Sequence, residues 1–269
     1  MQQQPYKIGW FSTGRGEGSR NLLRSTVNSI IRGDLKVDIP FVFCNRVKGE
    51  HEGSDEFLRL AANYNLPVVC VSSKKYKQES GDGWRSRFEA EVMQKLEPYT
   101  FDLGVLAGYM LIVGRELCGK YPMINLHPAL PGGPIGTWQE VIWQLIEKKS
   151  KETGSMMHLV TPILDGGPVV SYCKFSIRGK SFDKYWSEIK GLPLWEIQKH
   201  EAERNPLFVE IRKQGAAREI PLVISTIKAF SEGRIKIDGG KVVDAKGKPI
   251  KGYDLSREID KKVKEPPAA

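Results

Sequence analysis

Short apolar runs alternate, through the first two thirds of the chain, with segments in which apolar residues recur every three or four positions. Runs such as YKIGWFST and FDLGVLAGY are apolar at most positions, which is typical of strands buried on both faces of a sheet. The segment SRNLLRSTVNSIIRG, which follows the first run, places its apolar residues on one side of a helix. This alternation predicts an α/β fold with a mainly parallel sheet flanked by helices.

The pattern changes after residue 178. Two strands are predicted just before this point, and any antiparallel strand is expected there, at an edge of the sheet. Beyond it the chain reads as helical to about residue 233, and we interpret 178–205 as a helical insertion. The stretch RIKIDGGKVVDAKGKPIKGY predicts a C-terminal β-hairpin. One domain is therefore expected over residues 1–253, followed by a charged tail at 254–269.

Composition narrows the class of protein. The chain has 269 residues, of which 40% are hydrophobic and 27% charged, as in a globular protein with a buried core. No apolar stretch approaches the ~20 residues that a membrane helix needs, and the N-terminal MQQQPYK lacks the apolar core of a secretion signal. We therefore expect a cytoplasmic protein that does not act at a membrane.

The net charge of +9 favours anionic ligands, either phosphates and carboxylates on small molecules or a nucleic acid backbone. Nucleic acid is the less favoured of these, because the sequence has no long arginine-rich helix and no aromatic residues at stacking intervals. The four cysteines are far apart, no CxxC pair occurs, and only four histidines are available. No structural zinc site is expected.

A glycine-rich loop, GRGEGS at residues 14–19, lies between the first predicted strand and the first predicted helix. Free backbone N–H groups at the start of a helix favour an anion, and glycines let the main chain approach it closely. The loop lacks the Gly-Lys-Ser/Thr of a P-loop and is a poor match to a dinucleotide fingerprint. By itself it fits a phosphate site and an ordinary tight turn about equally well.

Two further loops carry candidate catalytic residues. Asn125 and His127 end the predicted strand PMINLHP, and residues two apart on a strand point to the same side, so their side chains can converge on one atom. An amide and an imidazole together can stabilise charge that develops on a carbonyl oxygen. Asp165 lies in the turn LDGGP, where an aspartate is most often only a turn former. Ligands of such folds bind at the carboxyl ends of the strands, so the three loops are candidates to meet there.

Taken together, these segments resemble the folate-dependent formyltransferases. The resemblance rests on FDLGVLAGYM, INLHPALP, HLVTPILDGGPVV and IPLVISTIKAFSEGRIKI, in that order and at family-like separations, and covers residues 7–178 and 206–253. It is greatest for the members that formylate glycinamide ribonucleotide in purine synthesis. The resemblance implies a Rossmann-like formyltransferase fold and transfer of a formyl group from the cosubstrate 10-formyltetrahydrofolate to a primary amine, with no metal. It implies small-molecule partners and is compatible with a homodimer.

The resemblance also implies roles for individual residues. Asn125 and His127 would hold the formyl oxygen of the tetrahedral intermediate, and Asp165 would orient and charge the imidazole and help to move protons. The folate would contact the segment after the long apolar strand and the loop that carries Asp165, namely Tyr109, Met110, Leu111, Ile112, Val113, Val160, Thr161 and Leu164. The phosphate of the acceptor would contact Thr13, Gly14, Arg15, Gly16, Gly18 and Ser19.

The identity of the acceptor is the part that the sequence leaves open. In the purine enzymes a glutamate five residues before the proline of PLVIS contacts the acceptor, but here that position is Ala216, and Glu219 is the candidate replacement. Pro221 could also begin a new helix and break that geometry. The loop ALPGGPIGTWQEV is nearer in character to formyltransferases that act on other amines. The alternatives are an amino sugar nucleotide or methionyl-tRNA as acceptor, and a non-catalytic folate- or nucleotide-binding protein, against which the intact catalytic trio argues.

Overall fold

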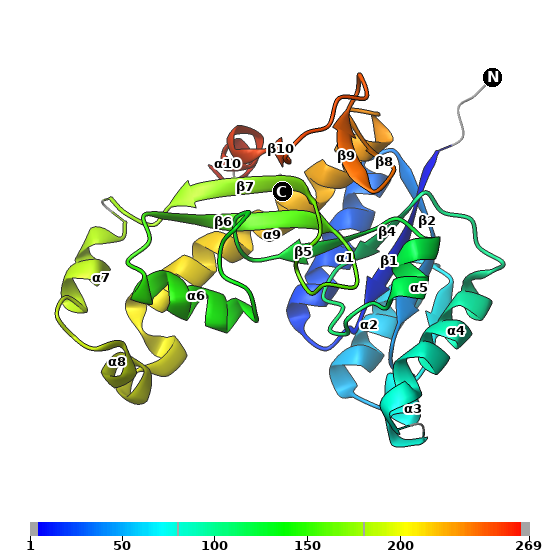
Figure 1. The fold of residues 1–269 in the computed structure, drawn as a ribbon, viewed down its shortest axis with the longest axis horizontal. Helices are drawn as coiled ribbons and strands as arrows, with labels where there is room; N and C mark the ends of the chain where they lie inside the picture. The colour runs from blue at the N-terminus through cyan, green and yellow to red at the C-terminus, as the bar shows by residue number, and fades with distance from the viewer. Residues whose placement is uncertain (1–4, 80, 180, 265–269) are drawn as a thin grey trace.

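The computed structural model describes residues 5–79, 81–179 and 181–264, and its centre is one eight-stranded sheet (Figure 1). The strand order is β10-β7-β6-β5-β4-β1-β2-β3. Strands β5, β4, β1, β2 and β3 run parallel, whereas β6 is antiparallel to both β5 and β7. The predicted mainly parallel sheet, with its antiparallel strands late in the chain and toward one edge, is confirmed. The strands of this sheet are β1 (Tyr6–Ser12), β2 (Val37–Cys44), β3 (Val68–Cys70), β4 (Leu103–Leu106), β5 (Met123–His127), β6 (Glu152–Leu159), β7 (Val169–Ser176) and β10 (Tyr253–Asp254).

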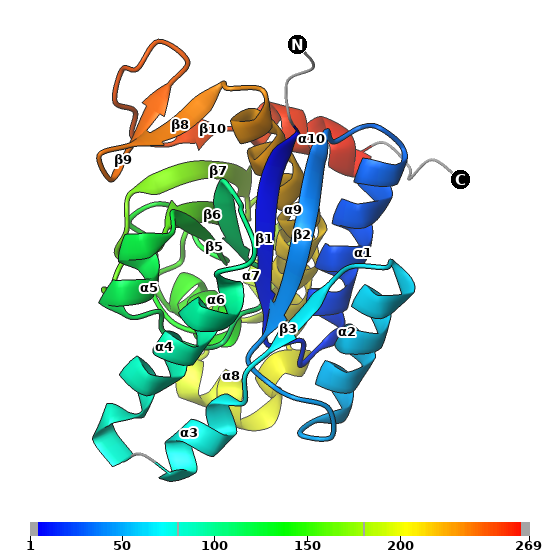
Figure 2. The ribbon, with the colours of Figure 1, turned by 90° about the vertical axis from the view of Figure 1, so that its right-hand side faces the viewer.

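Helices cover both faces of the sheet (Figure 2). Helices α1, α2 and the C-terminal half of α9 pack on one face, in a core that includes Trp10 and Ile227. Helices α4 and α5 pack on the other face, around the rings of Phe11, Phe43 and Phe88. Burial on both faces explains why the strand sequences are apolar at most positions. The helices are α1 (Glu17–Ile31), α2 (Glu52–Asn63), α3 (Ser73–Glu79), α4 (Trp84–Leu96), α5 (Arg115–Lys120), α6 (Trp138–Glu147), α7 (Asp183–Glu188), α8 (Leu194–His200), α9 (Pro206–Ser231) and α10 (Ser256–Lys264). Within the described ranges, no helix has the length and apolar character that crossing a membrane requires.

A third core lies beside the sheet, where the predicted insertion at 178–205 forms α7, α8 and a short 3-10 turn. These elements pack with α6 and the start of α9 around Phe182 and Phe208. Helix α9 continues through Pro221, so the expectation that this proline could begin a new helix is wrong. Complete burial of Leu222 and Val223 against the sheet offsets the ~3 kcal/mol that a proline inside a helix costs.

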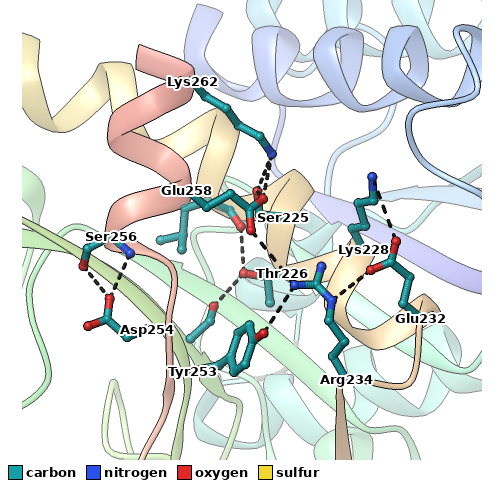
Figure 3. Close-up of polar contacts among 12 residues, drawn as sticks. Ser225, Thr226, Lys228, Glu232, Arg234, Tyr253, Asp254, Ser256, Glu258 and Lys262 are labelled. Atoms are coloured by element: carbon teal, nitrogen blue, oxygen red, sulfur yellow. Dashed lines mark hydrogen bonds and ion pairs between the residues drawn. The ribbon is translucent and has the colours of Figure 1, made fainter. Parts of the chain in front are cut away.

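The C-terminal segment is part of the folded domain. Strands β8 (Ile235–Asp238) and β9 (Lys241–Asp244) form the predicted antiparallel hairpin. Residues 254–264 of the predicted charged tail contribute to β10 and form α10, which packs on α9 and β7 with Ile259 fully buried. Figure 3 shows how α10 is attached: Glu258 accepts hydrogen bonds from Ser225 Oγ (2.7 Å) and Lys262 Nζ (2.8 Å). Residues 254–264 of the predicted charged tail are therefore ordered and packed on the domain, and 265–269 lie outside the described residues.

Candidate functional site

The carboxyl ends of β1, β4 and β5 lie side by side and bring the loops that follow them together. The loop after β1 is bonded to the loop after β4, because Thr13 N donates to Gly108 O (2.9 Å) and Met110 N donates to Thr13 Oγ1 (2.8 Å). Gly108 has a φ of +72°, and a Cβ there would lie 2.3 Å from Ser19 Oγ. The Gly-rich loop and the predicted folate-binding segment are therefore held at a fixed separation.

The Gly-rich loop leaves backbone N–H groups free at the start of α1. Helix α1 begins at Glu17, and none of the described side chains caps its N-terminus. Gly14 has a φ of +65° and its Cα faces Phe57, so a larger residue fits neither the conformation nor the space. Open space surrounds Gly16 and Gly18 within the described part of the chain. The loop can therefore accept an anion at the helix N-terminus.

The six predicted phosphate contacts differ in what they offer a ligand. Thr13 is buried and its hydroxyl already accepts from Met110, so it shapes the loop. Arg15, Gly16 and Gly18 are exposed at the turn into α1. Arg15 O lies so close to the start of α2 that a Cβ on Gly53 would approach it to 2.2 Å. Close packing against α2 thus fixes the main chain of the loop.

The candidate catalytic residues converge. Asn125 and His127 come from β5, and Asp165 comes from the loop between β6 and β7. His127 Nδ1 lies 3.5 Å from Asp165 Oδ2, and His158 Nε2 lies 3.4 Å from Asp165 Oδ1 and 3.2 Å from Asn125 Nδ2. The side chains of both histidines are 4% exposed and that of Asp165 is 8% exposed. The cluster is therefore largely shielded from water, which strengthens its electrostatic interactions.

The charges within the cluster favour an ionised aspartate. A hydrogen bond with His158, together with the nearby charge of His127, outweighs partial burial and lowers the pKa of Asp165 below its ordinary value. His127 Nε2 lies 3.0 Å from Pro134 O, so both of its ring nitrogens face oxygen acceptors. A neutral ring can donate to one of these oxygens, and only a doubly protonated ring can donate to both.

Asp165 also has an uncommon backbone conformation. Its φ is +50°, in the left-handed region that few residues other than glycine adopt. Asparagine and aspartate tolerate this region better than other side chains. A carboxylate presented from such a turn is typical of a site where local strain serves positioning rather than stability.

His158 is the residue of this cluster that we did not predict. It belongs to the apolar strand β6, in which a histidine reads as a buried structural residue. The antiparallel pairing of β6 with β5 places His158 directly opposite Asn125. In the sequence, only the position of His158 six residues before the LDGG turn indicates that it could lie near Asp165. The pairing of β6 with β5, a long-range property, determines that it does.

The predicted folate contacts fall into two groups. Met110, Ile112 and Leu164 are 65%, 39% and 53% exposed, and they lie on the loop after β4 and on the loop that carries Asp165. Ile163, which we did not predict, is 71% exposed on the same loop as Leu164. Exposed apolar side chains on adjacent loops provide a surface for an aromatic ligand. The buried members, Tyr109, Val113 and Val160, belong to one core cluster, Leu111 packs against it, and Thr161 bonds to the carbonyl of residue 163.

Glu219 lies on α9 beside a small cavity that also contacts Pro128, the neighbour of His127. Its carboxylate forms an ion pair with Arg212, whose guanidinium lies 4.7 Å from the centre of the Trp138 ring. The structure therefore brings Glu219 near the catalytic loop, but with its carboxylate already paired. Over the described ranges, no group of three His, Cys, Asp or Glu side chains could hold a metal ion.

Comparison with known proteins agrees with this geometry. A family model described as formyl transferase matches residues 14–181. The chain is 29% identical over 167 residues to a phosphoribosylglycinamide formyltransferase of Schizosaccharomyces pombe, covering 59% of this chain and 77% of that protein. It is 29% identical over 252 residues to a protein of the same name from Haemophilus influenzae, covering 92% and 98%. The solved phosphoribosylglycinamide formyltransferase of Coxiella burnetii has the same fold, with a TM-score of 0.68, 21% identity and coverage of 93% and 99%.

Proposed function

This chain belongs to the formyl transferase family, and we propose that it transfers the formyl group of 10-formyltetrahydrofolate to the primary amine of glycinamide ribonucleotide. The observation that carries the proposal is the convergence of Asn125, His127 and Asp165 at the end of β5, between a free helix N-terminus and exposed apolar loops. The relatives named above support the choice of acceptor, since they are named for phosphoribosylglycinamide, the same compound.

In the proposed reaction the acceptor amine attacks the formyl carbon. A C–N bond forms, the carbonyl π electrons move to oxygen, and Asn125 and His127 donate hydrogen bonds to the oxyanion. For His127 Nε2 to do so, it must exchange its contact with Pro134 O for the formyl oxygen. Desolvation within the cluster makes these hydrogen bonds stronger than they would be in water.

The tetrahedral intermediate then collapses, and the bond between the formyl carbon and the folate nitrogen breaks. The nitrogen of the acceptor loses one proton and the departing folate nitrogen gains one, so protons balance. Asp165 and His158 lie where such a proton can be relayed, because His158 Nε2 faces both Asp165 and Asn125. The ionised Asp165 also keeps the imidazolium of His127 favourable while the oxyanion exists.

The two substrates would approach from different loops. The acceptor phosphate would bind the free N–H groups at Gly16–Gly18, and Arg15 adds a cation beside it. The pterin would lie against Met110, Ile112 and Leu164, whose apolar side chains are already exposed. Tyr109, Val113 and Val160 would support this surface from the core, and Thr161 would hold the second loop in shape. Both substrates then meet at Asn125 and His127.

The alternative acceptors, an amino sugar nucleotide and methionyl-tRNA, keep the same donor chemistry. The absence of a carboxylate at Ala216 is the feature that leaves room for them, and under our proposal Glu219 provides the missing polar contact. A cytoplasmic location and a homodimer are further expectations, which cell fractionation and size-exclusion chromatography would check.

Turnover is the test. Purified protein with 10-formyltetrahydrofolate should formylate glycinamide ribonucleotide and leave a 4-amino sugar nucleotide unchanged. His127→Ala and Asn125→Ala should each lower kcat on the order of 10²–10³ while folate affinity changes little. Transfer to the sugar alone would refute the acceptor, and folate binding without any turnover would favour a non-catalytic folate-binding protein.

A further inference from the structure

A cavity of about 300 Å³ lies at the end of β7 that is far from Asp165. It is bounded by the last residues of β7, the segment that leads into α7, one face of α9, and α10. The eight residues of β7 separate its two ends by roughly 25 Å. None of the described residues that line this cavity belongs to the Gly-rich loop, the catalytic cluster or the folate-facing loops. The cavity is therefore separate from the proposed active site.

Cations dominate the lining. Arg178, Arg218 and Lys264 reach it from three different segments, and Asp260 is the single carboxylate among the described lining residues. That carboxylate is already occupied, because Asp260 Oδ1 accepts from Arg218 Nη2 at 2.9 Å. Among the described lining residues, three cations therefore face one carboxylate, which leaves an excess of positive charge.

Arg218 is held rigidly at the wall of this cavity. The residue is 8% exposed, its Nη1 donates to Gln214 O (2.9 Å) and Gln214 Oε1 (3.1 Å), and its guanidinium lies 4.3 Å from the centre of the Phe175 ring. Its Nε–H has no acceptor within the described part of the chain. A buried donor without a partner leaves the positive charge of Arg218 only partly satisfied by the described residues.

Arg178 is also fixed before any ligand arrives. Its Nε donates to Ser150 O (3.2 Å), its Nη2 donates to Lys149 O (2.7 Å), and its guanidinium stacks 3.7 Å from the centre of the Trp186 ring. Binding to two fixed guanidinium groups orders few side chains, so little conformational entropy is lost on binding. Lys264 is exposed and adds a third cation to the lining.

We propose that this cavity is a second anion-binding site, which takes the phosphate group of a small metabolite. Guanidinium groups bind phosphate oxygens through paired N–H donors, and both Arg178 and Arg218 line the cavity. A volume of about 300 Å³ is at the lower limit of ligand pockets, which restricts the ligand to a small molecule. The site goes beyond the proposed formyl transfer and does not depend on it.

The test is calorimetric titration of the full chain with inorganic phosphate at low, constant ionic strength. Lys264→Gln should raise the dissociation constant for this site about threefold, and the Arg178→Gln/Lys264→Gln double variant at least tenfold. Lys213→Gln is the matched control, because it removes a lysine that is 73% exposed on α9 and outside the cavity lining. Phosphate bound at the Gly-rich loop would be retained in all three variants, so formyl transfer should continue in each.

Asp260→Asn provides a test of opposite sign. It frees Arg218 Nη2 and removes the negative charge, so phosphate should bind several-fold more tightly, and thermal unfolding measured alongside would show whether the fold persists. Isotherms that match the wild type in both the double variant and Asp260→Asn would overturn the proposal and leave the cavity to water. Loss of phosphate binding in Lys213→Gln to the same extent would also overturn it, as a nonspecific effect of net charge.

Discussion

Replacement of Asp165 by asparagine tests the proposed mechanism most directly. The change removes one negative charge that lies 3.5 Å from His127 Nδ1 and 3.4 Å from His158 Nε2, and leaves the shape of the side chain almost unchanged. Asparagine also tolerates the φ of +50° at this position, so the turn should keep its conformation. Any loss of activity then reports on charge.

The size of the effect follows from these distances. Two unit charges 3.5 Å apart attract by about 5 kcal/mol at an effective dielectric constant of ~20. Water and the amide dipole of asparagine would recover part of this, so we expect the barrier to rise by about 3–4 kcal/mol. That corresponds to a fall in kcat on the order of 10²–10³. The folate dissociation constant should change less than threefold, because the exposed apolar loops are untouched.

Single-turnover kinetics and folate titration would measure the two quantities separately. Asp165→Ala is the companion variant: it should lose as much activity and also unfold more easily, because alanine is strained at a positive φ. The pKa of Asp165 is lowered in the folded protein, so its carboxylate stabilises the fold above the ordinary aspartate pKa and this contribution is lost as pH falls through the lowered value. The asparagine variant should lack that acid dependence. Turnover near the wild-type rate in the asparagine variant would remove the charge of Asp165 from the mechanism.

Three further predictions concern other parts of the molecule. Gly53→Ala would bring a Cβ within 2.2 Å of Arg15 O, so the Gly-rich loop must shift. We expect the free energy of unfolding to fall by about 1–3 kcal/mol and the acceptor KM to rise at least tenfold. Gly119→Ala is the neutral control, because a Cβ there meets no atom of the described residues within 4 Å. Partial burial raises the pKa of Glu258, but its bonds to Lys262 and Ser225 outweigh this, so Glu258→Gln should destabilise the protein at neutral pH, and denaturant titrations should show this deficit shrinking as pH falls below about 4. Glu219→Gln should raise KM for glycinamide ribonucleotide with unchanged donor affinity; unaltered kinetics would exclude Glu219 as an acceptor contact.

The sheet could be predicted because its signal is local. The signal consists of continuous apolar runs, glycine and proline at their ends, and helical spacing between them, all of which are properties of neighbouring residues. These features identify strands such as β1 and β4 without knowledge of any long-range contact. The same local reasoning failed for α10, whose sequence SREIDKKVK is mostly charged. Leu255, Ile259 and Val263 recur every four residues there, and this weak apolar stripe becomes a stable helix only because α9 and β7 cover it.

The candidate catalytic cluster likewise combines local relations that the sequence predicts with long-range relations that it does not. Asn125 and His127 could be paired from the sequence because they are two residues apart on one strand. The role of His158 depends on the register between β5 and β6, which spacing along the chain does not encode. Arg212 and Glu219 lie two turns apart on the same face of α9, so helical spacing allows their ion pair, but only the packing of α9 brings Glu219 near the loop after β5. The sequence therefore identifies which side chains could take part in the proposed reaction, whereas strand register and packing determine which of them lie close together.

The contact between His127 and Pro134 explains how such a cluster can be ready before a substrate binds. The carbonyl of Pro134 lies 3.0 Å from Nε2, within the range at which oxyanion-hole donors hold an oxygen. It thereby fixes the direction of the N–H that the proposed reaction would use. A peptide carbonyl is neutral, whereas the formyl oxygen gains charge in the transition state, so the same donor binds the transition state more strongly than the loop. When the formyl oxygen replaces the Pro134 carbonyl, His127 loses one neutral hydrogen bond, which contributes about 0.5–1.5 kcal/mol. In the transition state it gains a stronger hydrogen bond to a charged oxygen.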